Sequence, residues 1–280
     1  MRVKLGMSEE EVLMRITESV SYARRFVSEV EWTPEVATES DPVFLERAIH
    51  TAVRAGASVI NIADTTGYML PHEYGALIAR VVAHVSAYDG VTVSAHCHND
   101  LGCAVANSLT ALSAGARQVE CTVNGIGERA GNAALEEVMV ALTVRKNTLH
   151  LSHGVALHGL TELSACVAKA SRTPVAFNKA VVGRNAFSHE SGIHQDGVLK
   201  DPRLYEVIDP ALVGRTRSIT LGKLSGMAAL KHAIGLLGFL PNEFDEHALK
   251  EGFKVLADTH GSVNEAQLAT LISLLRRSER

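Results

Sequence analysis

The sequence predicts an α/β protein that begins with a parallel sheet and continues as a mostly helical part. Between residues 27 and 145, four β-rich segments are each followed by a helical pattern, and the strands recur roughly every 30 residues, the period of βαβ units. Polar side chains gather where each strand ends, the end that carries the site in both (β/α)8 barrels and doubly wound sheets. In chain order they are Thr33 and Glu35, Asp64 and Thr65, His96 and His98, Asn124 and Asn132.

Local signals set the expected element boundaries in this first part. Ser8 and Glu11 have the spacing of a capping box, so a helix is expected from Ser8 onwards. Asp41 before Pro42 predicts another helix start, and Gly56 predicts that helix's end. The expected strands are 27–35, 58–65, 91–96 and 118–124, and the expected helices are 8–23, 41–56, 71–82, 101–114 and 133–145.

After Arg145 the alternation of strand and helix stops. Residues 178–197 are rich in glycine and polar side chains and are expected to form loops, and helical periodicity dominates from Ser225 onwards. We therefore expect two domains, a sheet domain at 1–183 and a small helical subdomain at 184–280. The helices expected in this part are 161–171, 225–237, 243–259 and 264–277.

Composition narrows the class of protein. The 27 Lys and Arg against 31 Asp and Glu give a net charge of −4 without long runs of one sign, which argues against nucleic acid and anionic membranes as partners. Four cysteines without a CxxC pair are typical of reduced thiols, so we expect a cytoplasmic protein. No apolar run reaches the roughly 18 residues of a membrane span, and the first residues lack the core of a signal peptide.

The segment His96-Cys97-His98 is the leading candidate for a metal site. In a strand, alternate side chains share a face, so His96 and His98 point the same way and Cys97 points the opposite way, into the core. The two residues are separated by roughly 7 Å of strand, which allows both rings to reach one ion. The alternative is a polar strand face without a metal.

Four further features complete the set of candidates. Asn132 can supply an oxygen ligand, or it can cap a helix that starts at Ala133. Glu35 is either a general acid/base or a solvated loop residue, and His194, expected in a loop between glycines, is either functional or a surface histidine. The glycine-rich loop 125–129 lacks GxGxxG spacing and follows the last strand of the series, which argues against dinucleotide binding.

Three motifs resemble one family. His-Cys-His-Asn-Asp-Leu-Gly-Cys-Ala-Val-Ala-Asn-Ser at 96–108, Asn-Gly-Ile-Gly-Glu-Arg-Ala-Gly-Asn at 124–132 and Ser-Gly-Ile-His-Gln-Asp-Gly at 191–197 are similar to 2-isopropylmalate synthase, a member of the acyl-CoA-condensing, metal-dependent TIM-barrel group. The resemblance covers nearly the whole chain and implies a partial (β/α)8 barrel of about four βα units. It also implies condensation of acetyl-CoA with 3-methyl-2-oxobutanoate, the first committed step of leucine biosynthesis, by an enzyme that is a homodimer in the intact family.

The resemblance also assigns roles to side chains. It implies that His96, His98 and Asn132 bind a divalent ion (Mn²⁺, Mg²⁺ or Zn²⁺). It implies that Thr33 and Thr65 hold the 2-oxo acid. It also implies that Glu35 is a catalytic glutamate and that His194 assists in deprotonating acetyl-CoA.

One departure from the family pattern limits these expectations. The family's barrel begins with a strand carrying an Arg-Asp pair, whose Asp binds the metal, and we find no such strand in this sequence. We therefore expect the C-terminal half of a barrel, with two open edges, an apolar inner face and weak or no activity alone. The alternatives are homocitrate or citramalate synthase, and a non-catalytic metal-binding half of a split barrel.

Overall fold

The computed structural model describes residues 6–240 and 243–278. The chain forms two compact units, Met1–Val155 with Leu163–Thr173, and Ala156–Glu162 with Pro174–Arg280. The domain boundary expected between residues 183 and 184 stays a prediction. Within the described ranges, every helix is too short or too polar to cross a membrane.

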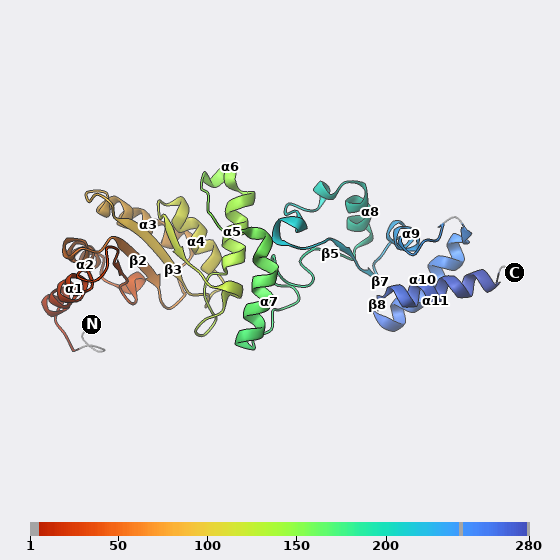
Figure 1. Ribbon diagram of the computed structural model, residues 1–280, viewed down its shortest axis with the longest axis horizontal. Coiled ribbons are helices and arrows are strands. Elements are labelled where there is room, and N and C mark those ends of the chain that lie inside the picture. Colours follow the sequence, from red (N-terminus) through yellow and green to blue (C-terminus); the bar gives the residue numbers. More distant parts are fainter. Residues whose placement is uncertain (1–5, 241–242, 279–280) are drawn as a thin grey trace. The chain divides into compact units, whose positions relative to one another are not determined.

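The first unit contains one sheet of four parallel strands in the order β1-β2-β3-β4 (Figure 1). Each strand is followed by at least one helix, so the predicted succession of βα units is confirmed. In this register His96 lies between Ala63 on β2 and Glu120 on β4. The strands are β1 (Glu31–Trp32), β2 (Val59–Asp64), β3 (Thr92–Cys97) and β4 (Gln118–Glu120).

The helices of this unit begin and end largely where the capping signals predict. Ser8 and Glu11 form the expected capping box, and the carboxylate of Asp41 accepts hydrogen bonds from two backbone N–H groups of the first turn of α2. Gly56 ends that helix at a φ of 110°, a conformation that glycine adopts readily. The helices are α1 (Glu9–Ala23), α2 (Pro42–Ala55), α3 (Pro71–Val85), α4 (Ala104–Ser113), α5 (Leu135–Val144) and α6 (Lys146–Leu149).

One face of the sheet is apolar and covered by helices. Ile60, Ile62, Val93 and Ala95 are at most 4% exposed. Cys97 belongs to the same face and is fully buried, and this burial raises the pKa of its thiol to about 12. Cys97 is therefore a core residue, as the alternation of side chains predicts, and its thiol stays protonated at neutral pH.

The opposite face of the sheet is polar, which corrects the expectation of an apolar inner face. Gln118 on β4 donates a hydrogen bond from Nε2 to Oε2 of Glu31 on β1, and the two atoms are 2.5 Å apart. In a flat sheet those strands would lie about 14 Å apart, at 4.7–4.9 Å for each of three steps, so the sheet curls strongly towards this face. The side chains on the concave face are Glu31, Asn61, Ser94, His96, Gln118 and Glu120.

An acidic pair spans the concave face. Partial burial, followed by the hydrogen bond with Glu120 and that group's charge, raises the pKa of Glu31. Asn61 and Ser94 are fully buried on the same face, and the side-chain oxygen of each has no hydrogen-bond partner in the described part of the chain. The concave face therefore carries two buried oxygens that no described protein group satisfies, in contrast to an ordinary core.

The second unit is mostly helical, as expected (Figure 1). Its largest core lies between α9, α10, α11 and the β7–β8 pair, where Leu230, Ile234, Leu249, Leu268 and Ile272 are at most 1% exposed. The segments between the helices of this unit form two separate two-stranded sheets, β5 with β6 and β7 with β8. Helix α7 (Leu160–Ser171) begins in this unit, and from Leu163 onwards it belongs to the first unit. The other elements are β5 (Ser188–His189), α8 (Gly192–Lys200), β6 (Ser218–Ile219), β7 (Leu221–Gly222), α9 (Met227–Leu236), α10 (Glu246–His260), β8 (Ser262–Val263) and α11 (Glu265–Ser278).

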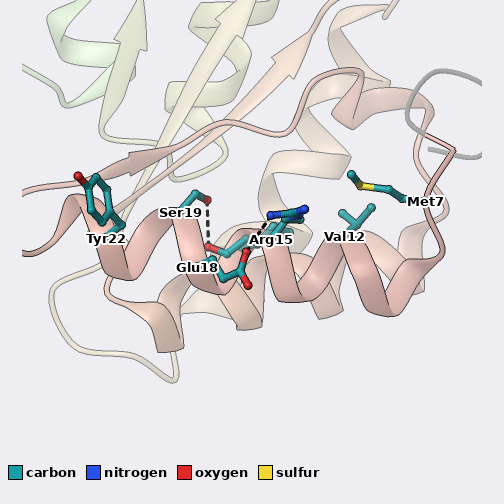
Figure 2. Close-up of a pocket in the computed structure, with 7 residues that line it drawn as sticks. Met7, Val12, Arg15, Glu18, Ser19 and Tyr22 are labelled. Atoms are coloured by element: carbon teal, nitrogen blue, oxygen red, sulfur yellow. Dashed lines mark hydrogen bonds and ion pairs between the residues drawn. The ribbon is translucent and has the colours of Figure 1, made fainter.

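A shallow pocket of about 560 Å³ lies along the exposed side of α1, between Met7 and Tyr22 (Figure 2). The polar groups that line it are partnered on the helix itself. Arg15 pairs with Glu18, and the hydroxyl of Ser19 donates to a backbone carbonyl of the preceding turn. None of the residues with a predicted functional role lines this pocket.

Candidate metal and substrate site

The three predicted metal ligands lie next to one another at the carboxyl end of β3. The rings of His96 and His98 have centroids 4.9 Å apart and an interplanar angle of 69°. His98 also pairs with Asn132 in an isolated antiparallel bridge. The bridge places Asn132, near the end of the loop between β4 and α5, beside the end of β3. Two segments 34 residues apart in sequence thus meet at one strand end.

The side-chain chemistry at this strand end fits a divalent ion. Asn132 Oδ1 is buried and has no hydrogen-bond partner among the described residues, which is costly unless a ligand satisfies it. Burial, and then the charge of His98, lowers the pKa of His96 and favours the neutral ring that metals bind. Two imidazole nitrogens and an amide oxygen suit Zn²⁺, Mn²⁺ or a similar ion.

The ligand set is not extended by a nearby acidic side chain. Within residues 6–240 and 243–278, no three His, Cys, Asp or Glu side chains are grouped so as to hold a metal ion. Glu120 Oε2 does lie 2.8 Å from His96 Nδ1, close enough for an ionic contact although the pair does not have the geometry of a full hydrogen bond. Glu120 therefore faces a ring nitrogen of His96 and is a neighbour of that imidazole.

The structure excludes the alternative role of Asn132 as a helix cap. Helix α5 begins at Leu135 with Ala134 at the N-cap position, and no side chain caps it. Asn132 instead donates from Nδ2 to the carbonyl oxygen of Ile126, which orients the amide within the glycine-rich loop. Its Oδ1 is thereby left free for a cation.

The glycine-rich loop places Asn132 through a close backbone crossing. Gly131 has a φ of 91°, and a Cβ at this position would overlap the carbonyl oxygen of Gly125. The backbone N–H of Asn132 donates to that same carbonyl at 2.9 Å. The glycines therefore serve a tight turn, as expected, and the turn determines where the Asn132 amide lies.

Substituting Gly131→Ala is expected to destabilise the chain by about 2–4 kcal/mol, since a left-handed φ without glycine costs about 1 kcal/mol and the overlap with Gly125 adds more. Urea unfolding of the variant measures the loss. Gly90→Ala is the matched control, because Gly90 has a φ of 76° and no atom within 4 Å of its added Cβ. Equal losses in the two variants would contradict a role for the crossing.

Arg129 joins the three strand-end loops, and sequence reasoning missed it. Its Nη2 donates to the carbonyl oxygen of Thr65 at 2.6 Å and contacts His98 Nδ1 at 2.7 Å. Its Nε and Nη2 donate to the two carboxylate oxygens of Asp100 at 2.9 and 3.2 Å, and this hydrogen bonding lowers the pKa of Asp100. The loops after β2, β3 and β4 thus share one guanidinium.

The two predicted substrate-binding threonines differ in their hydrogen bonding. Thr65 Oγ1 accepts from the backbone N–H of Val36 at 2.9 Å, so the hydroxyl keeps its own hydrogen to donate to a substrate. Thr33 Oγ1 accepts from Asn61 and donates to Glu31 at 3.4 Å, towards the concave face. Thr65 is therefore the more suitable donor to a carboxylate.

Glu35 lies in a different depression from the histidines. A cavity of about 600 Å³ at the end of β1, between α1 and α2, is lined by Thr33 and Glu35 but not by Thr65, His96 or His98. Glu35 is connected to the histidine region through the next residue, Val36, whose N–H binds Thr65. The structure thus brings the Glu35 loop and the Thr65 loop into contact.

His194 lies in the second unit, and its predicted loop is in fact a helix. It belongs to α8, is exposed, and has its ring centroid 4.4 Å from that of Tyr205. The expectation of a loop was wrong because the two glycines of this segment serve packing: a Cβ on Gly192 would lie 2.9 Å from the backbone nitrogen of Gly226, and Gly197 faces the ring of Tyr205. Tyr205 is a further residue beside His194 that the sequence did not reveal.

Comparison with known families identifies the chain. Residues 1–167 match the family model described as HMGL-like. The chain belongs to the HMGL-like family. Residues 181–261 match the model described as Homocitrate synthase post-HMGL domain-like, in the second unit of this HMGL-like protein.

Curated relatives of this HMGL-like chain carry the name 2-isopropylmalate synthase. It is 48% identical over 275 residues to the one from Lysinibacillus sphaericus, covering 98% of this chain and 54% of that protein. It is 46% identical over 288 residues to the one from Caulobacter vibrioides, covering 100% of this chain and 54% of the relative. The resemblance expected from the three motifs is thereby confirmed, and the chain spans about half the length of the curated relatives it matches.

Solved structures confirm the fold class. The HMG-CoA lyase of Bacillus subtilis aligns with a TM-score of 0.51 at 19% identity, covering 66% of this chain and 62% of that one. The hydroxymethylglutaryl-CoA lyase of Pseudomonas aeruginosa aligns with a TM-score of 0.52 at 22% identity, covering 62% and 60%. At these identities the likeness shows the fold alone, an α/β barrel-type arrangement of βα units.

Proposed function

We propose that this chain carries the condensation site of a 2-isopropylmalate synthase, which joins acetyl-CoA to 3-methyl-2-oxobutanoate and releases 2-isopropylmalate and CoA. The observation that supports it most is the position of His96, His98 and Asn132 at one strand end, where the buried Oδ1 of Asn132 lacks a partner. Relatives of that name at 46–48% identity support the same assignment.

The proposed metal ligands are His96, His98 and Asn132, and the ion is Mn²⁺, Mg²⁺ or Zn²⁺. When bound, a divalent ion supplies Lewis-acid polarisation of the ketone of the 2-oxo acid. Thr65 donates its free hydroxyl hydrogen to the substrate carboxylate, and Thr33 lies on the same side of β1 as the concave face. Arg129 holds the Thr65 loop at the correct distance from β3.

The proposed acid–base residues are Glu35 and His194. A base removes a proton from the methyl group of acetyl-CoA, the new carbon–carbon bond forms at the ketone carbon, and water then cleaves the thioester to give free CoA. Glu35 follows a strand end, where parallel sheets of this type place catalytic groups. His194, stacked near Tyr205 on α8, is proposed to assist the deprotonation. We further propose a cytoplasmic, homodimeric enzyme.

The test is to purify the 280-residue chain and follow free CoA with a thiol reagent in the presence of acetyl-CoA, 3-methyl-2-oxobutanoate and Mn²⁺. We expect weak turnover, because the described residues supply no carboxylate ligand and the concave face is open to one side. Glu35→Gln and His194→Gln are each expected to remove the remaining turnover, and Arg15→Gln on the outside of α1 is the control. CoA release that is unchanged in both catalytic variants would contradict the proposal.

A second candidate function is supported by one observation, the match of residues 181–261 to a homocitrate synthase model. The two functions differ only in the 2-oxo acid. Assaying CoA release with 3-methyl-2-oxobutanoate, 2-oxoglutarate and pyruvate side by side separates isopropylmalate, homocitrate and citramalate synthesis. A preference for 2-oxoglutarate would favour the homocitrate assignment.

A further inference from the structure

The two histidines at the end of β3 face groups of opposite hydrogen-bonding character. His96 Nδ1 lies 2.8 Å from a carboxylate oxygen of Glu120, which can only accept a hydrogen when ionised. His98 Nδ1 lies 2.7 Å from Nη2 of Arg129, which can only donate. The surroundings of the two rings therefore favour different positions for the single N–H hydrogen of a neutral imidazole.

We infer that His96 and His98 are held in opposite neutral tautomers and that Arg129 is a positioning residue that latches His98 until a cation binds. On His96 the hydrogen sits on Nδ1, towards Glu120, and leaves Nε2 with a free lone pair. On His98 the Nδ1 lone pair accepts from Arg129, so the hydrogen sits on Nε2. Only His96 then presents a nitrogen that is ready to bind a metal.

Binding of a cation by His98 requires that its hydrogen bond with Arg129 break. If Nδ1 becomes the ligand, the guanidinium must leave that lone pair. If Nε2 becomes the ligand, its hydrogen must move to Nδ1, and an N–H there cannot accept from Arg129. Starting from a neutral ring, both routes therefore separate Nη2 of Arg129 from Nδ1 of His98.

Arg129 has somewhere to go when it releases His98. Its guanidinium already forms two hydrogen bonds with the Asp100 carboxylate, and its side chain is 41% exposed to solvent. Release of His98 therefore leaves the Arg129–Asp100 pair intact.

The tautomers are measured directly by long-range ¹⁵N–¹H NMR of the imidazole nitrogens in the metal-free 280-residue chain, at about pH 8, above the ordinary histidine pKa of about 6.5. His96→Gln and His98→Gln assign the two sets of signals. We expect Nδ1–H on His96 and Nε2–H on His98, and a shift of His98 towards Nδ1–H in Arg129→Gln. An Nδ1–H on His98 in the unsubstituted chain, or no change in Arg129→Gln, overturns the inference.

The latch also predicts the direction of a change in metal affinity, and this part rests on the proposed function. Arg129→Gln is expected to bind Mn²⁺ about 3- to 10-fold more tightly by electron paramagnetic resonance titration, with Arg15→Gln on the outside of α1 as the control. Equal or weaker binding in Arg129→Gln overturns the latch. Failure of every variant to bind Mn²⁺ would count against the proposed metal site, while the NMR result would still decide the tautomers.

Discussion

Replacing His96 by alanine is expected to weaken Mn²⁺ binding by about 100-fold or more and to abolish any condensation. Removing even an outer-shell partner of a metal ligand typically costs 10–100-fold in affinity, and His96 would be a ligand itself. The substitution would remove one of the two imidazoles whose ring centroids lie 4.9 Å apart at this strand end. Electron paramagnetic resonance titration with Mn²⁺ measures the affinity, and the free-CoA assay measures the chemistry.

Cys97→Ala provides the matched control one residue further along the same strand. Cys97 faces the helices, where its thiol is fully buried, so the substitution is expected to cost about 1 kcal/mol of stability while leaving Mn²⁺ affinity unchanged. A loss of Mn²⁺ affinity in Cys97→Ala as large as in His96→Ala would show that disturbance of β3, not loss of a ligand, is responsible.

The part of the fold that the sequence predicts correctly depends on local rules. The capping box at Ser8 and Glu11, the Asp41-Pro42 helix start and the Gly56 helix end all appear as expected, because each is decided within four residues. The faces of His96, Cys97 and His98 follow from the two-residue period of a strand. The strands themselves are shorter than expected, most of all β1, which keeps only Glu31–Trp32 of the expected 27–35.

The unpredicted features depend on contacts between distant segments. The polar concave face was missed because Glu31 and Gln118 lie 87 residues apart and meet only when the sheet curls. Arg129 was read as part of a turn, yet its side chain reaches back 64 residues to the Thr65 carbonyl. The helical state of the segment around His194 is a tertiary effect, in which glycines serve close packing instead of turns. Periodicity and capping rules do not contain this information.

Substituting Glu206→Gln is expected to destabilise the second unit by about 2–3 kcal/mol. The Glu206 side chain is 6% exposed and accepts hydrogen bonds from Arg217 at 2.7 and 2.6 Å, while His189 Nε2 lies 2.9 Å from it. Removing one charge of such a buried network leaves the other without its partner, which costs 3–5 kcal/mol in a fully buried pair and less where Arg217 can still reach water. Urea unfolding, followed by the helical circular dichroism signal, measures this loss of unfolding free energy.

The same network predicts how the stability difference between the native chain and Glu206→Gln depends on pH. Hydrogen bonding from Arg217 lowers the pKa of Glu206 in the folded chain, so its stabilising contribution is fully present above the ordinary glutamate pKa of about 4.3 and is lost as the pH falls through the folded value. The unfolding free energies of the native chain and Glu206→Gln should therefore converge below about pH 4. Glu246→Gln, on an exposed pair with Lys231, is the control and should cost at most about 1 kcal/mol at any pH. A difference in unfolding free energy that stays constant across this pH range would contradict the role of the Glu206 charge.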